Sequence, residues 1–269
     1  MPINRILLTA ALGLLGFRAA AQTAPTQDPQ RPRPIIAALL RSAYPDQAAL
    51  TSFWNGILIP TDFVLPVGSS DPNYGSGIKA TRMTSANLIP GVTSTAQRLN
   101  GQNAWIVYDL EASAPGVTES QELQDELKDY VNSVRTAAAA VHANGGKLVF
   151  TPTYPDILTY GAGFAPYCDL INMQISPYTP GYEGRVESCT RIVKTANPEA
   201  IVLVQLGALT GTSPEQNTDP ADAIVAWNSV RNIVDGLLID YVNSPDPIPI
   251  LKQFCAAILT PQRSRRFRP

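Results

Sequence analysis

Short apolar runs alternate with segments of helical periodicity through the last two thirds of this chain. The runs are rich in Val, Ile and Leu and are bounded by turn residues, which predicts buried strands at Trp105–Glu111, Lys147–Thr153, Asp169–Ile175, Ile201–Gly207 and Gly236–Val242. Between and before them, the spacing of apolar residues predicts helices at Ser94–Leu99, Glu119–Asn144, Gly184–Ala196 and Pro220–Ile233. Strands that alternate with helices in this way predict βαβ units and a parallel sheet.

The first third of the chain repeats this pattern less regularly. A strand is expected at Ile35–Leu40, a helix at Asp46–Trp54 and a strand at Phe63–Val67, followed by a loop at Gly68–Gly75. The number of strands approaches eight, so the predicted fold class is α/β, a (β/α)8 TIM-barrel-like domain that is irregular in its first third. A doubly wound open sheet is the alternative, but no strand is followed by G-x-G-x-x-G, and Gly161-x-Gly163 lacks the third glycine and the helical context.

The two ends of the chain differ from this pattern. Residues 1–21 combine Arg5, an apolar stretch too short to span a bilayer and the small residues Ala19–Ala21, which predicts a secretory signal peptide; an uncleaved anchor is the alternative. Residues 22–34 form a Pro-rich leader, residues 35–260 the single barrel domain, and residues 261–269 a basic tail. The expected location is therefore secreted or periplasmic, with no membrane span after cleavage.

Composition limits the function further. The chain has 269 residues, of which 45% are hydrophobic and 16% charged, and a formal net charge of -2, so it can bury one barrel core and shows no electrostatic footprint for nucleic acid. Cys168, Cys189 and Cys255 have no metal-type spacing and allow either one disulfide with one free thiol or three buried thiols. His142 is the only histidine and lies near a predicted helix end, where a structural role is expected.

A single histidine leaves no Ser-His-Asp triad, Cys-His pair or His-ligated metal centre, so no cofactor is expected and the chemistry must come from carboxylates, amides and tyrosines. Asp109 and Glu111 stand two residues apart at the end of one predicted strand and therefore share a face. Loop capping by Asp109 and a salt bridge of Glu111 are the plain alternative. Other polar side chains follow the remaining strands: Thr151, Thr153, Tyr154, Asp156, Gln174, Ser176, Tyr178, Gln205, Asp240 and Tyr241.

In a closed barrel these groups would converge at the carboxyl end of the strands, where barrel enzymes have their active sites. Converging carboxylates, amides and aromatic rings suit a sugar site, since one acid protonates the leaving oxygen while another group stabilises the oxocarbenium-like centre. The predicted substrate-binding residues are Gln174, Tyr178, Tyr154, Asp240, Tyr241 and Gln205.

The segment Tyr108-Asp109-Leu110-Glu111 resembles the second half of the glycoside hydrolase family 18 signature D-x-x-D-x-D-x-E. Lys147–Asp156 and Asp169–Gln174 are similar to the next two strands of plant-type chitinases, and the chain also resembles uncharacterised secreted bacterial barrel proteins. The resemblance covers roughly residues 100–245. It implies a chitinase-like TIM barrel with Glu111 as general acid, Asp109 as its partner and Gln174 as a substrate contact, acting on a polysaccharide with N-acetylated sugars.

The chain departs from that signature at several positions. Ala104 and Val107 stand where the signature has its first two Asp residues, Ser176 replaces a Tyr, and Tyr241 stands in place of a Trp. Three hypotheses therefore stay open: a secreted glycosidase, a catalytically silent carbohydrate-binding or cell-envelope protein, and a divalent-metal site of Asp109, Glu111 and Asp240. The expected partner is a polysaccharide or cell-wall glycan, and the expected state is a monomer.

Overall fold

The computed structural model describes residues 33–41, 46–67, 77–81, 88–110, 120–177, 180–207, 220–240 and 248–259, which belong to one compact unit. Within these ranges eight parallel strands close into one barrel in the order of the sequence. The predicted (β/α)8 architecture is confirmed. The expected signal peptide, residues 22–32 of the leader, the loop at 68–75 and the basic tail lie outside the described residues.

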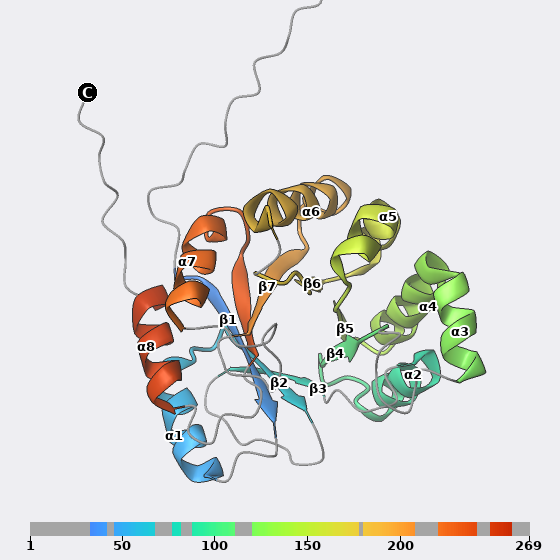
Figure 1. Ribbon diagram of the computed structural model, residues 1–269. Helices are drawn as coiled ribbons and strands as arrows, with labels where there is room; N and C mark the ends of the chain where they lie inside the picture. Colours follow the sequence, from blue (N-terminus) through green and yellow to red (C-terminus); the bar gives the residue numbers. More distant parts are fainter. Residues whose placement is uncertain are drawn as a thin grey trace, which may run out of the picture. The chain divides into compact units, whose positions relative to one another are not determined.

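Helices surround the ring of strands (Figure 1). The strands are β1 (Ile35–Arg41), β2 (Phe63–Val67), β3 (Ile78–Thr81), β4 (Trp105–Tyr108), β5 (Lys147–Phe150), β6 (Leu170–Met173), β7 (Ile201–Gly207) and β8 (Gly236–Asp240). The helices are α1 (Gln47–Ile57), α2 (Ile89–Arg98), α3 (Gln121–Lys128), α4 (Tyr130–Ala143), α5 (Tyr154–Phe164), α6 (Tyr182–Ala196), α7 (Pro220–Val230) and α8 (Ile248–Leu259), with a 3-10 turn at Ala165–Tyr167.

Alternation along the strands divides the apolar core in two, because successive side chains point to opposite faces of a strand. One set packs between the strands and the helices; on β4 it contains Ile106 and Tyr108. The other set fills the barrel interior and comprises Ala37, Phe63, Leu65, Ala80, Trp105, Val107, Val149, Leu170, Leu203 and Leu238. Strands β1 and β8 lie very close together at Gly236, since a Cβ on this glycine would lie 2.0 Å from the carbonyl oxygen of Ile35.

The prediction of a single long helix at Glu119–Asn144 is wrong. The chain forms α3 and α4 instead, with Asp129 between them at φ -120° and ψ 54°. The hydroxyl of Ser133 donates to the carbonyl oxygen of Glu126 at 3.0 Å, so a side chain takes the acceptor that a continuous helix would use. The break lets α3 turn its carboxylate Glu126 toward β4.

Helix α5 was not predicted, and the statement that Gly161 and Gly163 lack a helical context is wrong because both lie within it. A Cβ on Gly161 would lie 2.9 Å from Cγ2 of Ile192 on α6, and a Cβ on Gly163 would lie 3.0 Å from Cγ2 of Val131 on α4. These glycines therefore serve close helix packing and not phosphate binding. Helix α8 was likewise missed.

An aspartate precedes three of the even-numbered strands at the amino end of the barrel. Asp62 stands before β2; its Oδ1 accepts from the backbone N–H of Ile36, and its Oδ2 accepts from the N–H of Ile59 and from the Arg33 guanidinium. Asp62 is completely buried. The carboxylate thereby ties the start of β1 to the start of β2.

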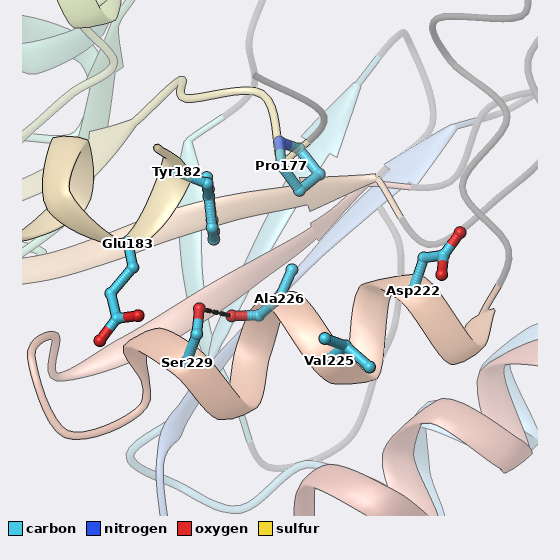
Figure 2. Close-up of a pocket in the computed structure, with 7 residues that line it drawn as sticks. All are labelled: Pro177, Tyr182, Glu183, Asp222, Val225, Ala226 and Ser229. Carbon is cyan, nitrogen blue, oxygen red and sulfur yellow. Dashed lines mark hydrogen bonds between the residues drawn. The ribbon is translucent and has the colours of Figure 1, made fainter. Parts of the chain in front are cut away.

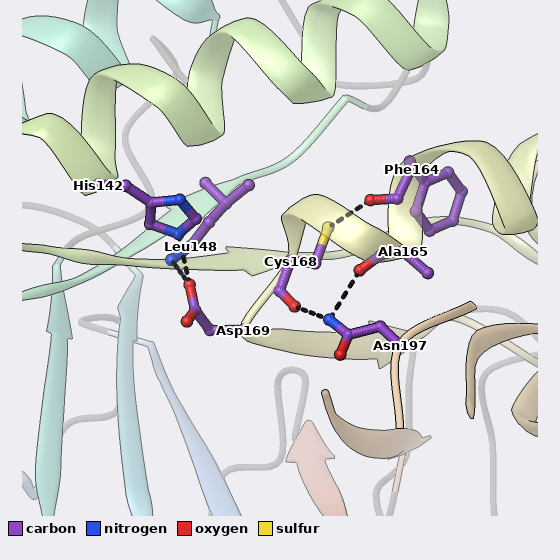
Figure 3. A network of polar contacts seen from close by, with 7 residues as sticks. All are labelled: His142, Leu148, Phe164, Ala165, Cys168, Asp169 and Asn197. Carbon is purple, nitrogen blue, oxygen red and sulfur yellow. Dashed lines mark hydrogen bonds and ion pairs between the residues drawn. The ribbon is translucent and has the colours of Figure 1, made fainter. Parts of the chain in front are cut away.

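The same arrangement recurs twice. Asp169, before β6, accepts from the N–H of Leu148 on β5 and lies 2.8 Å from Nε2 of His142 (Figure 3). Asp235, before β8, accepts from the N–H of Val202 on β7 at 2.9 Å and pairs with Lys194 at 2.7 Å. Each acid thus joins a backbone donor of the preceding strand to one cationic or imidazole group, and the structural role expected of His142 fits this position.

The three cysteines are free and buried, so the alternative of three thiols holds and no disulfide forms. Burial raises the pKa of Cys189 to about 11 and that of Cys255 to about 12. In the part of the chain that the structure describes, no helix is both long and apolar enough to cross a bilayer.

Candidate functional site

Asp109 lies at the carboxyl end of β4, directly after the last strand residue. Trp105 and Val107 face the barrel interior, whereas Ile106 and Tyr108 face the helices, so the alternation assigns Asp109 to the interior side. Its side chain is half-buried, and its Oδ1 accepts a hydrogen bond of 2.6 Å from the Thr151 hydroxyl. A carboxylate is therefore held, with partial exposure, at the end of the barrel where catalysis takes place in this fold.

Thr151 joins Asp109 to the next strand. It is 3% exposed and follows β5; besides donating to Asp109, it accepts a bond of 3.1 Å at its carbonyl oxygen from Nε2 of Gln174. The backbone N–H of Gln174 in turn donates to the carbonyl of Pro152 at 3.0 Å. Asp109 and Gln174, which were predicted as site residues, thus lie on either side of Thr151. Thr151 was noted as a strand-end residue but not assigned to the site.

A second polar pair lies one strand further round the barrel. Asn172 on β6 donates from Nδ2 to Oε1 of Gln205 on β7 at 3.2 Å. Asn172 is 1% exposed, and its Oδ1 has no hydrogen-bond partner among the described residues. The predicted residue Gln205 is therefore oriented by an asparagine that sequence reasoning missed. The sequence contained a signal for Asn172: it is the one polar residue in an apolar strand, and it stands two positions before Gln174, on the same face.

The described polar side chains of the barrel interior lie at the carboxyl ends of β4 to β7: Asp109, Thr151, Asn172, Gln174 and Gln205. Hydrogen bonds join Asp109, Thr151 and Gln174 in one group and Asn172 and Gln205 in another. Nearer the amino end, every strand contributes apolar side chains to the interior. A sugar ring has polar edges and apolar faces, so polar groups beside an apolar surface suit it.

Tyr154 and Asp156 have structural partners. Tyr154 begins α5, and the Arg185 guanidinium lies 4.7 Å from the centre of its ring, so one face of this predicted stacking residue is covered by the protein itself. Asp156 accepts from the N–H and hydroxyl of Thr153 and so caps the start of α5. Thr153 in turn pairs with Gln174 across an isolated bridge.

Several predicted site residues cannot be placed with these. Glu111, Tyr178 and Tyr241 lie outside the described residues. Asp240 is described only in its backbone, where it pairs with Gly207 at the end of β8. Over the described ranges no group of three His, Cys, Asp or Glu side chains could hold a metal ion; the side chains of Glu111 and Asp240, two of the three carboxylates in the metal hypothesis, lie outside those ranges.

Behind β4, a buried pair of acidic groups supports the site strand. The hydroxyl of Tyr108 donates to Oε2 of Glu126 at 2.7 Å, and Oε1 of Glu126 accepts from the N–H of Ile89 at 3.0 Å. Burial, together with the bond and charge of Glu126, raises the pKa of Tyr108 far above its usual range, and burial raises the pKa of Glu126. The pair fixes α2 and α3 on the back of the strand that carries Asp109.

No protein family description matches the chain, and no curated protein matches it significantly. Solved structures do match in fold. A chitinase from Chromobacterium violaceum superposes with a TM-score of 0.52 at 12% identity, over 84% of this chain and 98% of the chitinase. The spore cortex-lytic enzyme SleL of Bacillus megaterium gives 0.52 at 9% identity, over 86% of this chain and 74% of the enzyme.

A third match is a GH128 (subgroup I) endo-β-1,3-glucanase from Amycolatopsis mediterranei, solved with laminaritriose. It gives a TM-score of 0.50 at 13% identity, over 84% of this chain and 99% of the glucanase. The resemblance stated from the sequence is therefore confirmed at the level of fold: the chain has a divergent, chitinase-like TIM barrel of the kind that these glycoside hydrolases share. At such low identity the likeness extends to the fold alone.

Proposed function

We propose that this protein is a secreted glycoside hydrolase that cleaves a polysaccharide at the carboxyl end of its barrel, with N-acetylated sugars as the preferred units. The observation that carries the proposal is the position of Asp109, a half-buried carboxylate held by Thr151 and flanked by the amide of Gln174. Carboxylates beside amides supply the charge and the hydrogen bonds that a glycosidic transition state requires. The fold shared with glycoside hydrolases supports it.

In this proposal Glu111, two residues beyond Asp109, is the general acid and base. Asp109 assists it, and the Thr151 hydroxyl fixes the orientation of Asp109. The Oδ1 of Asn172, which has no partner among the described residues, is a buried acceptor near the site that a bridging water would satisfy. The substrate-binding side chains are Gln174, Gln205, Tyr154, Tyr178, Asp240 and Tyr241. Secretion follows from the signal peptide expected at residues 1–21.

The test is hydrolysis by purified wild-type protein and by Glu111→Gln, measured by product release from chitin oligomers, peptidoglycan and β-1,3-glucan. We expect turnover of at least one of these by the wild type and a loss of at least about 100-fold in the variant, which keeps the shape but not the proton. Glu122→Gln on α3 removes an exposed acid and is the matched control. Equal activity of wild type and Glu111→Gln would reject the assignment.

A specific observation also favours a second function, carbohydrate binding without catalysis. Val107 stands where the chitinase signature has an Asp, and its side chain is 1% exposed in the apolar barrel interior. A carboxylate at this position would disrupt the apolar packing. The chain therefore lacks the acidic residues that precede Asp109 in the chitinase signature. Tight glycan binding by the wild type on an array, with no product released from any bound glycan, would favour this function over hydrolysis.

A further inference from the structure

Asn172 is the most deeply buried of the described polar side chains at the carboxyl ends of the strands. It lies on β6, is 1% exposed and faces the barrel interior, two positions after Leu170 of the interior core. Every other residue of β6 is apolar. A buried amide costs free energy unless both its donor and its acceptor are hydrogen-bonded. The partners of Asn172 therefore decide whether the fold tolerates it.

One end of the Asn172 amide has a partner and the other does not. Nδ2 donates to Oε1 of Gln205 on β7 at 3.2 Å. Oδ1 is enclosed and has no hydrogen-bond partner among the described residues. Buried side-chain oxygens are normally hydrogen-bonded, either to protein or to an ordered water. Oδ1 of Asn172 therefore points to a donor next to it inside the barrel.

The register of the strands brings Thr151 next to Asn172. Val149 on β5 pairs with Leu170 on β6, and the isolated bridge that follows the two strands keeps this register. Thr151 and Asn172, two residues further along, are therefore opposite one another. Both share the phase of Val149 and Leu170, so both side chains face the interior. Neighbouring strands lie about 4.8 Å apart, which puts the two side chains within reach of one shared water.

Thr151 cannot supply the donor by itself. Its hydroxyl has a single proton, which it donates to Oδ1 of Asp109 at 2.6 Å. The hydroxyl oxygen can still accept, and among the described residues no donor serves it. Two acceptors, Oδ1 of Asn172 and Oγ1 of Thr151, are thus neighbours on adjacent strands. A water molecule has two protons and can donate to both.

We infer that Asn172 is a positioning residue of the candidate site, and that one buried water joins its Oδ1 to the hydroxyl oxygen of Thr151. The two hydrogen-bonded groups of the site then form one continuous chain, from Gln205 to Asp109. A water that donates to Thr151 polarises its hydroxyl and strengthens the bond to Asp109, since hydrogen bonds in series reinforce one another. Asn172 thereby acts on Asp109 without touching a substrate. The inference deepens the proposed function and rests on it for any effect on turnover.

The water can be tested without any activity, by a crystal structure of the protein at a resolution that shows ordered waters. We expect one water at about 2.7–3.2 Å from both Oδ1 of Asn172 and Oγ1 of Thr151. In Asn172→Leu, whose side chain is similar in size but accepts no hydrogen bond, this water should be absent. A wild-type structure with no water shared by the two oxygens would overturn the inference, whether or not the protein cleaves a glycan.

The positioning role is tested by a double-mutant cycle on kcat, measured per folded molecule with a glycan that the wild type cleaves. We expect Asn172→Leu to lower kcat about three- to tenfold. Thr151→Val should lower it more, because it removes the bond to Asp109 itself. The double variant should lose no more than Thr151→Val alone, since both residues act on Asp109 through one chain. Additive losses would overturn the positioning role.

Ser229→Ala provides the control for this cycle. Ser229 lies on α7 and donates to the carbonyl of Ala226 at 2.8 Å, in a pocket between α6 and α7 (Figure 2). The variant should leave kcat unchanged alone, and it should not alter the loss caused by Asn172→Leu. If the wild type cleaves no glycan, the proposed function fails, and the crystal structure still decides whether the water is present.

Discussion

The two ends of the barrel use carboxylates in opposite ways. At the amino end, Asp62, Asp169 and Asp235 each accept a backbone N–H of the neighbouring strand and pair with Arg33, His142 or Lys194. At the carboxyl end, Asp109 is half-buried and accepts a hydrogen bond from the neutral hydroxyl of Thr151.

We expect the two ends to have different roles. A carboxylate that is paired stabilises the fold through its partners, and removing it leaves them unsatisfied. In the proposed function, the half-buried carboxylate of Asp109 acts on a substrate at the carboxyl end of the barrel. We therefore expect substitutions at the amino end to change stability and substitutions at the carboxyl end to change activity.

The largest stability effect should come from Asp62→Ala. The substitution leaves the N–H groups of Ile36 and Ile59 and the Arg33 guanidinium without their acceptor in a fully buried place. We expect a loss of about 3–5 kcal/mol in the free energy of unfolding, measured by urea denaturation. Asp46→Ala, which removes only an exposed helix cap at Ala49, should cost about 1 kcal/mol. Equal losses in the two variants would contradict the role given to Asp62.

Asp235→Ala should have a smaller effect, because this carboxylate and Lys194 are partly exposed. The N–H of Val202 loses its acceptor, and we expect a loss of about 1–3 kcal/mol by the same measurement. Lys194→Met keeps the bond to Val202 and removes the ion pair together with the bonds from Nζ to the carbonyls of Pro198 and Ala200. Because the lysine is partly exposed, the variant should still cost less than Asp235→Ala. A larger cost for the lysine variant would show that the contacts of Lys194, and not the bond to Val202, hold the two strands together.

Glu126 allows a pH test between the two ends, since it supports β4 from behind. Burial raises its pKa in the folded state above the unfolded value, so its contribution to stability is fully present at acid pH and is lost as pH rises through the folded pKa. Glu126→Gln does not titrate. We expect the difference in unfolding free energy between wild type and variant to shift in favour of the variant from pH 4 to pH 8. A pH-independent difference would contradict this sign.

The smallest effect is expected for the cysteines of the core, which belong to neither end. Burial raises the pKa of all three thiols, so little thiolate is present at pH 8. An aromatic disulfide reagent should not label the native protein, and it should label three thiols after denaturation. Fast labelling of one thiol in the native state would show that the core opens locally.

Much of the barrel follows from local sequence. The positions of the strands from β4 onward, and the side of β4 on which Asp109 lies, depend on the alternation of residues within one short segment. This alternation can be read directly from the sequence. The break at Asp129 and helix α5 could not be predicted from local sequence. The break depends on the contact of Glu126 with β4, and α5 depends on the packing of Gly161 and Gly163 against α6 and α4. Tertiary contacts of this kind outweigh helical periodicity.

The sequence indicated which residues lie in the candidate site, but not the hydrogen bonds between them. Asp109, Gln174 and Gln205 are polar residues at strand ends, and the fold brings such ends together. Their bonds to Thr151 and Asn172 depend on the register between strands that are far apart in sequence, as in the 42-residue separation of Asp109 and Thr151. The paired aspartates at the amino end were missed for the same reason.

One paired measurement tests the difference between the two ends most directly: turnover and unfolding free energy of Asp109→Asn beside those of Asp169→Ala. We predict that Asp109→Asn loses at least about 100-fold in turnover while its stability changes by about 1 kcal/mol or less, since Asn can still accept from Thr151. Asp169→Ala leaves the N–H of Leu148 and the ring of His142 without their acceptor, so it should lose about 1–3 kcal/mol of stability and keep its turnover per folded molecule. Normal turnover in Asp109→Asn would contradict the account.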